Sequence, residues 1–226
     1  MPTRKKTLTF CLSFLTSLGS FILICCILGT RAWVTSTITI TDDLLNGSVI
    51  ISYGLFYGKS VHELDHGLAE PDKDFDVLGT LGNSSQKALH TVVIVFLVLS
   101  LLTLLPSGGC TCYNSISNPY HTILGPMGVY ICNGLSGCFI FLTMILFVVN
   151  TQNNHLSEKL SQAFYPTVTH KGATHNYGYS FWLMLLVILL NIVTILIMVF
   201  YQKARYQQKK EQRKPMEYAP RDGILF

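Results

Sequence analysis

Long apolar stretches alternate with shorter polar segments along this chain. Four stretches are almost free of charged side chains, and they cover residues 8–30, 89–106, 123–149 and 180–201. Each has about the length, roughly 17 to 25 residues, that a helix needs to cross the hydrocarbon layer of a bilayer. The pattern therefore predicts an all-α membrane protein built as a four-transmembrane-helix bundle.

The basic residues of the polar segments predict which side of the membrane each segment occupies. Ten of the 16 Lys and Arg residues fall in the two ends and the middle connector, and six fall in the two other loops. Because cytoplasmic segments carry the excess of basic residues, we expect both termini in the cytoplasm. The predicted order is a cytoplasmic N-terminus at 1–7, an outer loop at 31–88, a cytoplasmic connector at 107–122, a second outer loop at 150–179 and a basic cytoplasmic tail at 202–226.

Two N-glycosylation sequons agree with this orientation. Asn46 and Asn83 each begin an Asn-x-Ser triplet, and both lie in the first outer loop. Glycosylation of such a triplet takes place on the lumenal side of the membrane. We therefore expect a glycoprotein that reaches the plasma membrane through the secretory pathway.

The seven cysteines are absent from both outer loops. These loops cannot be ordered by disulfides, so their order must come from packing or from partners. Cys11, Cys110 and Cys112 lie near the predicted inner face of the membrane. They are candidate palmitoylation sites, with unmodified thiols as the alternative.

The first outer loop is predicted to contain a β-hairpin. Residues 34–41, VTSTITIT, alternate apolar and hydroxyl side chains with the period of a half-buried strand. The turn dipeptide Asn46-Gly47 precedes SVIISYGLFYG, whose β-branched and aromatic residues predict a second strand. Because a two-stranded hairpin is marginally stable alone, we expect it to lie over the span ends or to gain further strands.

The remaining outer segments are predicted to be polar. The first loop continues into an acidic, solvated stretch, and the second loop is expected to be short and polar. Aromatic residues at the end of the second loop predict an interfacial belt that anchors the fourth span. They are Tyr177, Tyr179, Phe181 and Trp182.

The stretch VHELDHG in the first loop contains an H-E-x-x-H motif made by His62, Glu63 and His66. On a helix, the two histidines would share one face and could hold Zn²⁺ while the glutamate activates a bound water. A zinc enzyme needs a third ligand and a cleft, and the stretch between Gly58 and Pro71 leaves room for only about two helical turns, which are marginal. We expect a short solvated turn here, with no enzymatic activity, no metal and no cofactor.

The interior of the four spans contains no Asp, Glu, Lys or Arg. Proton relays, ion-coupled transporters and voltage sensors usually need such residues, so these functions are disfavoured. Small and polar residues occur instead, and they let helices approach one another and hydrogen-bond. We expect Asn133 and Asn191 to hold helices together, with a pore-lining role as the alternative. The small residues of the same kind are Ser13, Ser17, Ser20, Gly128, Gly134 and Gly137.

The tail beyond residue 201 has two candidate binding features. Its run YQKARYQQKKEQRKP should attract anionic lipid headgroups, at about 1 kcal/mol per basic residue near the surface, or act only as a stop-transfer anchor. The chain ends with apolar Ile224 and Phe226 at the third-last and last positions. This ending is suited to add as a strand to a PDZ domain.

Several segments resemble the clarins, a family of small tetraspan membrane proteins. They follow the family order through almost the whole chain: LGTRAW, YGLFYG, YNSISNPYHTILGPMGVY, MILF, HLSEKL and YSFWL, and the ending EYAPRDGILF resembles that of one family member. More distantly, Trp33 followed by Gly54, Leu55 and Phe56 is similar to the W…G-L-W pattern of claudin-like tetraspans. The paired loop cysteines of claudins are missing here, which argues against a claudin-type barrier.

The resemblance implies a non-enzymatic role. The resemblance implies a scaffold or accessory organiser of membrane protein complexes. Because clarins are linked to hearing and vision, it also implies a link to sensory perception of sound. A claudin-like junction protein or channel accessory subunit is the alternative. The partners expected from the sequence are membrane lipids and membrane or cytoskeleton-linked proteins, including a PDZ protein, with no nucleic acid and no small-molecule substrate.

Overall fold

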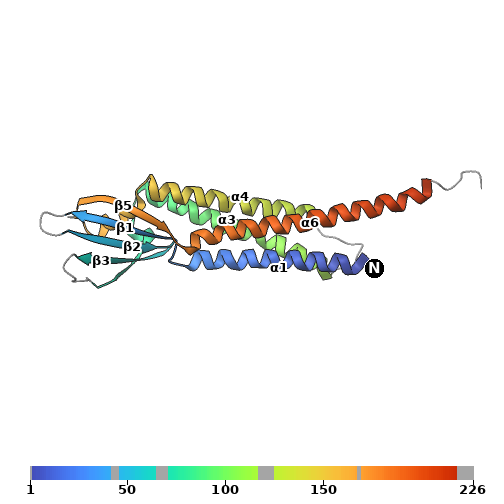
Figure 1. Ribbon diagram of the computed structural model, residues 1–226, viewed down its shortest axis with the longest axis horizontal. Helices are drawn as coiled ribbons and strands as arrows, with labels where there is room; N and C mark the ends of the chain where they lie inside the picture. Colours follow the sequence, from blue (N-terminus) through green and yellow to red (C-terminus); the bar gives the residue numbers. More distant parts are fainter. Residues whose placement is uncertain (1, 42–45, 65–70, 117–124, 167–168, 218–226) are drawn as a thin grey trace, which may run out of the picture.

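A long helical bundle carries a small sheet at one end (Figure 1). The computed structural model describes residues 2–41, 46–64, 71–116, 125–166 and 169–217. Both ends of the described chain lie at the end of the bundle opposite the sheet (Figure 1). This arrangement is the one that an even number of membrane crossings requires.

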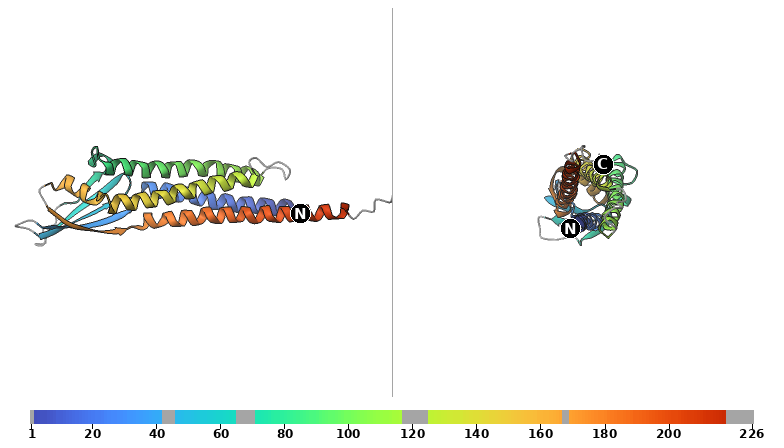
Figure 2. Two further views of the ribbon diagram at one scale, coloured as in Figure 1. Left: turned by 90° about the horizontal axis from the view of Figure 1, so that it is seen from above. Right: turned by 90° about the vertical axis from the view of Figure 1, so that its right-hand side faces the viewer.

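Four helices form the bundle: α1 at Pro2–Gly29, α3 at Ser85–Ile116, α4 at Gly125–Gln152 and α6 at Tyr179–Glu217. Each contains an apolar window long enough to cross a membrane, which confirms the predicted tetraspan bundle. Helix α3 continues through Pro106 instead of ending there. The helices form a ring in which α1 and α4 each pack against both α3 and α6, as the end-on view in Figure 2 shows.

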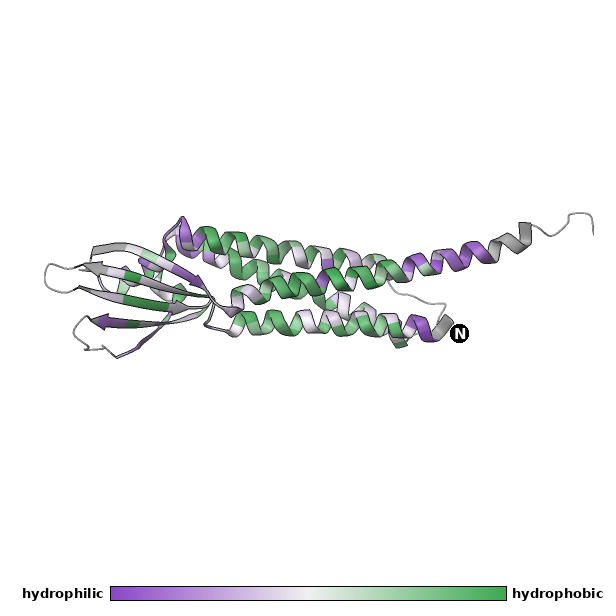
Figure 3. Ribbon diagram, viewed as in Figure 1, coloured by the Kyte–Doolittle hydropathy of each residue, from purple (hydrophilic) through white to green (hydrophobic). Residues whose placement is uncertain are grey.

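The buried positions of each long helix recur at alternating spacings of three and four residues. This heptad spacing is typical of helices that wind around one another with a left-handed twist. The outward faces carry large apolar residues, so that hydrophobic colour runs along the bundle in Figure 3, while its far ends are hydrophilic. Helix α1 illustrates the spacing with buried Phe10, Ser13, Ser17, Ser20, Ile24 and Ile27.

Small polar residues occupy the middle of the bundle interior. The Asn133 Nδ2 donates to Ser107 Oγ at 2.7 Å, and the Asn191 Nδ2 donates to Ser136 Oγ at 3.1 Å. The Ser136 hydroxyl also lies 2.7 Å from that of Ser100. These bonds join α3 to α4 and α4 to α6, which confirms the prediction that the two amides hold helices together. In a bilayer such pairing satisfies groups that lipid cannot.

Two of the glycines predicted to let helices approach closely do not do so. A Cβ atom built on Gly134 or Gly137 would have no other atom within 4 Å. Both positions face away from the close helix contacts, so the expectation was wrong for these two residues. The polar side chains on the buried face of α4 make the contacts instead.

The sheet has five antiparallel strands in the order β4-β3-β2-β1-β5. Strands β1 (Val34–Thr41), β2 (Asn46–Tyr53), β3 (Tyr57–Leu64) and β4 (Lys73–Asp76) come from the first loop, and β5 (Thr169–Tyr177) comes from the second. The hairpin thus gains further strands, which was one of the two expectations. The second loop is more structured than predicted, because it supplies β5 and the helix α5 (Leu156–Phe164).

Within the described residues, the H-E-x-x-H segment forms neither a helix nor a turn at His62, Glu63 and Leu64. Its described part belongs to strand β3, where His62 and Glu63 point to opposite faces as neighbours in a strand do. The His62 ring packs against Tyr165, with ring centroids 4.9 Å apart. Because His62 and Glu63 lie in a strand, they do not form the helix that the zinc motif needs. His66 lies outside the described residues.

Candidate functional site

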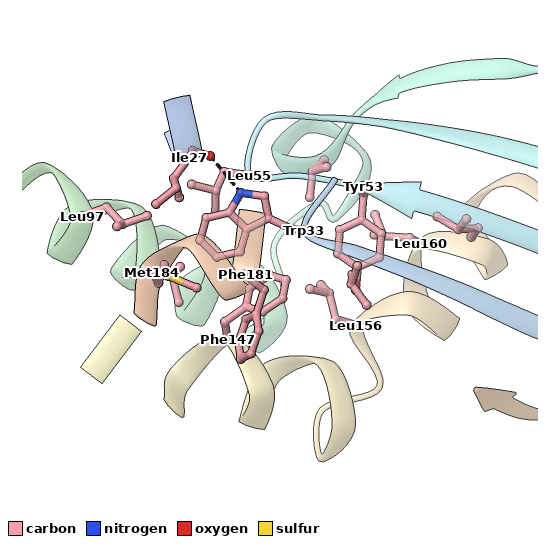
Figure 4. Close-up of a cluster of buried hydrophobic side chains, with 14 of the residues drawn as sticks. Ile27, Trp33, Tyr53, Leu55, Leu97, Phe147, Leu156, Leu160, Phe181 and Met184 are labelled. Atoms are coloured by element: carbon pink, nitrogen blue, oxygen red, sulfur yellow. Dashed lines mark hydrogen bonds between the residues drawn. The ribbon is translucent and has the colours of Figure 1, made fainter. Parts of the chain in front are cut away.

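The sheet meets the bundle at a buried tryptophan. Trp33 lies between the end of α1 and the start of β1, and its side chain is fully buried. Its Nε1 donates a 2.9 Å hydrogen bond to the carbonyl oxygen of Ile27, and its ring lies 4.8 Å from that of Phe147 in α4. Figure 4 shows the indole between residues of the bundle and residues of the sheet. We call this contact region, centred on Trp33, the junction.

Two glycines allow backbone segments to meet at the junction. A Cβ atom on Gly54 would lie 2.1 Å from the carbonyl oxygen of Thr30. A Cβ atom on Gly178 would lie 2.3 Å from the carbonyl oxygen of Ala32. Because backbone atoms cannot move aside as a flexible side chain can, any larger residue at either position must displace the chain.

The residues after Gly54 connect the sheet to α3 and to the short helix α2 (Val77–Thr80). The buried Leu55 accepts a 2.8 Å hydrogen bond at its carbonyl oxygen from the Nε2 of His90 in α3. The carbonyl oxygen of Phe56 accepts a 2.9 Å hydrogen bond from the backbone N–H of Val77. The backbone N–H of Trp33 donates to the carbonyl oxygen of Tyr53 at 3.2 Å. The structure thus brings Trp33 to the segment of Gly54, Leu55 and Phe56, the other residues of the claudin-like pattern, although Trp33 and Gly54 are 21 positions apart.

A second buried contact ties the sheet to α5 through hydroxyl groups. The Ser157 hydroxyl of α5 lies 2.7 Å from that of Ser36 in β1 and 2.8 Å from that of Tyr53 in β2. The Ser36 hydroxyl also lies 2.8 Å from the Nδ1 of His175 in β5. We call these four residues the hydroxyl network. It joins three strands and a helix from both outer loops.

Burial shifts two pKa values in the hydroxyl network. It raises the pKa of Tyr53 to about 12, against the opposing effect of the Ser157 hydrogen bond. It also lowers the pKa of His175, against the nearby charge of Glu158. Tyr53 is therefore a neutral phenol at physiological pH, and the neutral form of His175 is favoured. The Ser36 hydroxyl is buried and already hydrogen-bonded to Ser157 and His175. The hydroxyl network is therefore suited to hold the strands and α5 together and not to nucleophilic catalysis.

Two of the described residues in the acidic part of the first loop form exposed ion pairs. Arg31 contacts Asp74 at 3.0 Å, and Lys59 pairs with Asp72. Exposed pairs of this kind contribute little to stability, because solvent screens them. Within the described parts of the chain, no group of three or more potential ligands is placed to hold a metal ion.

The aromatic belt at the start of α6 is only partly as predicted. Tyr179 and Trp182 are 60% and 57% exposed, as the side chains of an interfacial belt would be. Phe181 is instead buried, and its ring packs 4.6 Å from that of Tyr177. The prediction was therefore wrong for Phe181, because helical spacing turns it toward the core while Tyr179 and Trp182 face outward.

The residues predicted to carry glycans or palmitoyl groups lie in the described part of the chain, and those predicted to bind a PDZ domain do not. Asn83 is exposed just before α3, and Asn46 is the first residue of β2, at the end of the sheet far from the bundle. Cys11 is exposed, while Cys110 and Cys112 are half-buried. Ile224 and Phe226 lie outside the described residues.

The roles of His90, Ser157 and His175 were not found from the sequence. Each contacts a residue 35 or more positions away. A short amphipathic stretch, LSEKLSQAF, was the signal available for α5. The family resemblance included part of this stretch, but no local pattern indicated which strands it would cover.

Comparison with known proteins gives matches over the whole chain. The family model described as Clarin-2-like matches residues 4–198. The chain is 70% identical to Clarin-3 from Homo sapiens and 64% identical to Clarin-3 from Mus musculus, in each case over 226 residues that make up 100% of both chains. It is 28% identical to Clarin-1 from Homo sapiens over 194 residues, which cover 81% of this chain and 83% of that one.

Proposed function

Since this chain belongs to the clarin family of tetraspan membrane proteins, we propose that it is a non-enzymatic organiser of membrane protein complexes. In this role it holds partners together on the two sides of the plasma membrane, with the sheet outside and both termini in the cytoplasm. The link to sensory perception of sound stays a prediction from the family resemblance.

Helix α6 is the observation that carries this proposal. It runs without interruption over 39 residues from the junction to the basic segment at the far end of the bundle. At its start, the Ser180 hydroxyl lies 2.6 Å from that of Thr30. A continuous helix fixed in this way supports a rigid connection between the outer sheet and the inner basic segment.

The two ends offer different surfaces to partners. The outward face of the sheet carries hydroxyl and charged side chains, such as Thr35, Thr39 and Lys59, which suit a polar protein partner. The inner end carries basic residues for lipid headgroups, and the predicted strand ending in Phe226 for a PDZ domain. No catalytic step is needed for this role.

Affinity capture from native membranes tests the proposal. The full chain is compared with a variant that lacks residues 224–226 and with a variant in which Thr35 and Thr39 are both changed to Lys. We expect the truncation to lose cytoplasmic partners and the sheet variant to lose outer partners, while each keeps the other set. Identical partner sets for all three proteins, or none above background, would refute an organiser role.

A claudin-like junction role is the alternative, and the adjacency of Trp33 and Gly54 favours it. A junction protein or channel subunit changes the electrical resistance of a cell layer or the whole-cell current when it is expressed. We expect neither to change for an organiser. A reproducible change that Gly54→Ala abolishes would support the alternative.

A further inference from the structure

A hollow of about 180 Å³ lies between α1 and α3. Leu18 and Leu105 line it and are 40% and 52% exposed, so the hollow opens on the outward surface of the bundle, which faces lipid. Two successive glycines of α3, Gly108 and Gly109, also line it. We call this feature the α1–α3 hollow. Because a cavity of roughly 150 Å³ holds one benzene molecule, the hollow has room for one inserted side chain.

The two glycines keep the α1–α3 hollow open. A Cβ atom on Gly109 would have no other atom within 4 Å, and one on Gly108 would lie 3.9 Å from the hydroxyl oxygen of Ser17. A side chain would therefore fit at either position without a clash, unlike at Gly54 or Gly178. The packing of α1 on α3 does not require these glycines, whereas small residues on a lipid-facing surface let the backbone of another helix approach.

Ser17 places an unpaired polar group at the α1–α3 hollow. It lines the hollow and is 1% exposed, and its hydroxyl oxygen has no hydrogen-bond partner among the described residues. The short distance to Gly108 shows that this oxygen is directed toward α3. By comparison, the hydroxyls of Ser100 and Ser136 lie 2.7 Å apart and are paired. Because an unpaired buried polar group is unfavourable, a bound group that pairs with Ser17 would gain affinity.

The depth of Ser17 in the membrane decides what can pair with it. Ser17 lies at the midpoint of the candidate span Arg4–Gly29, about 18 Å along the helix axis from either end. The middle of a bilayer contains hydrocarbon tails and neither water nor headgroups. A polar group at this depth is therefore carried by another transmembrane helix and not by a lipid.

A second copy of this chain does not present such a group. In the central turns of the four described spans, none of the fully exposed positions carries a Ser, Thr, Asn or Gln side chain. Leu15, Phe141 and Leu189, for example, are each 56% exposed and apolar. The chemistry of the hollow consequently favours a different protein as its occupant.

We propose that the α1–α3 hollow docks a transmembrane helix of a partner protein, which inserts one hydroxyl or amide side chain that pairs with Ser17. Side chains of Ser, Thr, Asn and Gln can donate to a hydroxyl or accept from it. Phe14 and Phe21 line the hollow on either side of Ser17, so their rings would flank the inserted side chain. The inference rests on the proposed function, because it names the surface by which an organiser holds one class of partner.

Site-specific photocrosslinking of the full chain in native membranes tests the proposal. The probe is a diazirine-bearing amino acid that replaces Leu105 beside the hollow or, as a control, Leu189 on the outward face of α6. Crosslinked peptides are sequenced by mass spectrometry. We expect the probe at 105 to label a transmembrane segment of another protein that contains Ser, Thr, Asn or Gln, and the probe at 189 not to label that segment. Labelling of lipid alone, of a second copy, or of a segment without such a residue would overturn the proposal.

A pair of serine variants tests the polar contact. Ser20 is buried in the same helix and its hydroxyl is also unpaired, but it does not line the hollow. One hydrogen bond between membrane helices corresponds on average to about a threefold change in affinity. Ser17→Ala should therefore lower the yield of the crosslink at 105 about threefold, and Ser20→Ala should leave it unchanged. Equal yields for the two variants would overturn the role of Ser17.

A pair of glycine variants tests the hollow itself. Gly109→Leu fills it, and Gly137→Leu adds the same side chain to the outward face of α4. Both should keep the thermal midpoint of the parent chain, because neither Cβ atom meets another atom within 4 Å. We expect Gly109→Leu to lower the crosslink yield about tenfold or more, as overpacking does, and Gly137→Leu to retain it. Equal yields for these two variants would overturn the site.

The docking site and the organiser role fail separately. A missing crosslink at 105, together with the expected loss of partners from the tail and sheet variants, would overturn the hollow and leave the organiser role intact. A crosslink with the expected variant pattern, together with identical partner sets for the tail and sheet variants, would support the hollow and refute the wider role.

Discussion

The indole Nε1 of Trp33 donates to the carbonyl oxygen of Ile27 at 2.9 Å, although the two residues belong to different parts of the fold. Ile27 is in the last turn of α1, where helix carbonyl groups lack intrahelical partners. The bond satisfies one of these groups and fixes the direction in which β1 leaves the helix. The sheet is thereby held on the bundle by a specific contact and not only by a flexible connection.

Gly54→Ala should destabilise the junction. The new Cβ atom would meet the Thr30 carbonyl oxygen at 2.1 Å, and overpacking of this kind costs about 1 to 3 kcal/mol. Thermal unfolding of the purified protein measures the change. Gly137→Ala is the control, because its Cβ atom meets nothing within 4 Å and Ala favours a helix. An unchanged midpoint for Gly54→Ala would contradict the close approach.

Asn133→Ala should loosen the contact between α3 and α4. It removes the 2.7 Å bond to Ser107 and the 2.8 Å bond to the carbonyl oxygen of Val129. Hydrogen bonds between membrane helices contribute about 0.6 kcal/mol on average and up to about 1.7 kcal/mol. We expect a loss in that range in denaturation by a mixture of detergents, and almost none for Cys138→Ala at an exposed position. An increase in stability for Asn133→Ala would contradict the claim that the Asn133 amide holds α3 and α4 together.

Acidification should weaken the outer sheet through His175. Burial lowers the pKa of this histidine in the folded protein. Below about pH 6.5, where an unfolded histidine gains its proton, the unfolded chain therefore binds more protons than the folded one. The free energy of unfolding then falls as the pH falls.

The groups that face His175 allow a controlled measurement. Glu158 in α5 and His155, the residue before that helix, act on it, the former favouring and the latter opposing its protonation. Chemical denaturation at pH 7.5 and pH 5.5 should show a smaller pH dependence for His175→Gln than for the parent chain. His155→Gln removes only the smallest of the influences on His175, so it should retain most of the dependence of the parent. The same slope in the parent and in His175→Gln would rule out this histidine as the source.

Removal of the sequons should change the mobility of the protein. Asn83 is exposed, and Asn46 begins β2, so both are expected to carry glycans on the outer side. Treatment with an N-glycosidase should shift the parent chain, and Asn46→Gln and Asn83→Gln should each remove part of that shift. A parent chain that does not shift would show that neither sequon is used.

Local patterns predicted the four long helices and the presence of the first hairpin, since each depends on residues that are close in sequence. The predicted turn and second strand were wrong in detail: Asn46 and Gly47 pair with Thr41 and Ile40 inside β2, and the stretch SVIISYGLFYG is divided between β2 and β3. The alternation in VTSTITIT identified β1, and the apolar runs identified the four spans. The boundaries of the spans differ from those of the helices, because a helix such as α6 continues beyond the bilayer as a polar segment. Membrane boundaries therefore stay predictions.

Local patterns could not predict β5 or the full role of the second loop. The sequence THKGATHNY contains few apolar residues and a glycine, which weakens the usual strand signal. Its partner β1 is more than 120 residues away, as in the pairing of Thr37 with Thr174. The roles of Ser157 and His175 follow only from this pairing, so the site was less predictable than the fold.

The central claim is that both outer loops build one sheet on the side of the membrane opposite the termini. Thr37→Cys with Thr174→Cys places two thiols opposite each other on β1 and β5, in loops that contain no native cysteine. Ser52→Cys with Thr174→Cys is the control, because β1 separates those strands.

Intact cells that express each double variant are treated with a membrane-impermeant oxidant, and the disulfide is identified by mass spectrometry of the linked peptides. The account predicts a link between positions 37 and 174 in intact cells and little or none between 52 and 174. It would be contradicted if the first link failed to form, or if it formed only after the cells were made permeable.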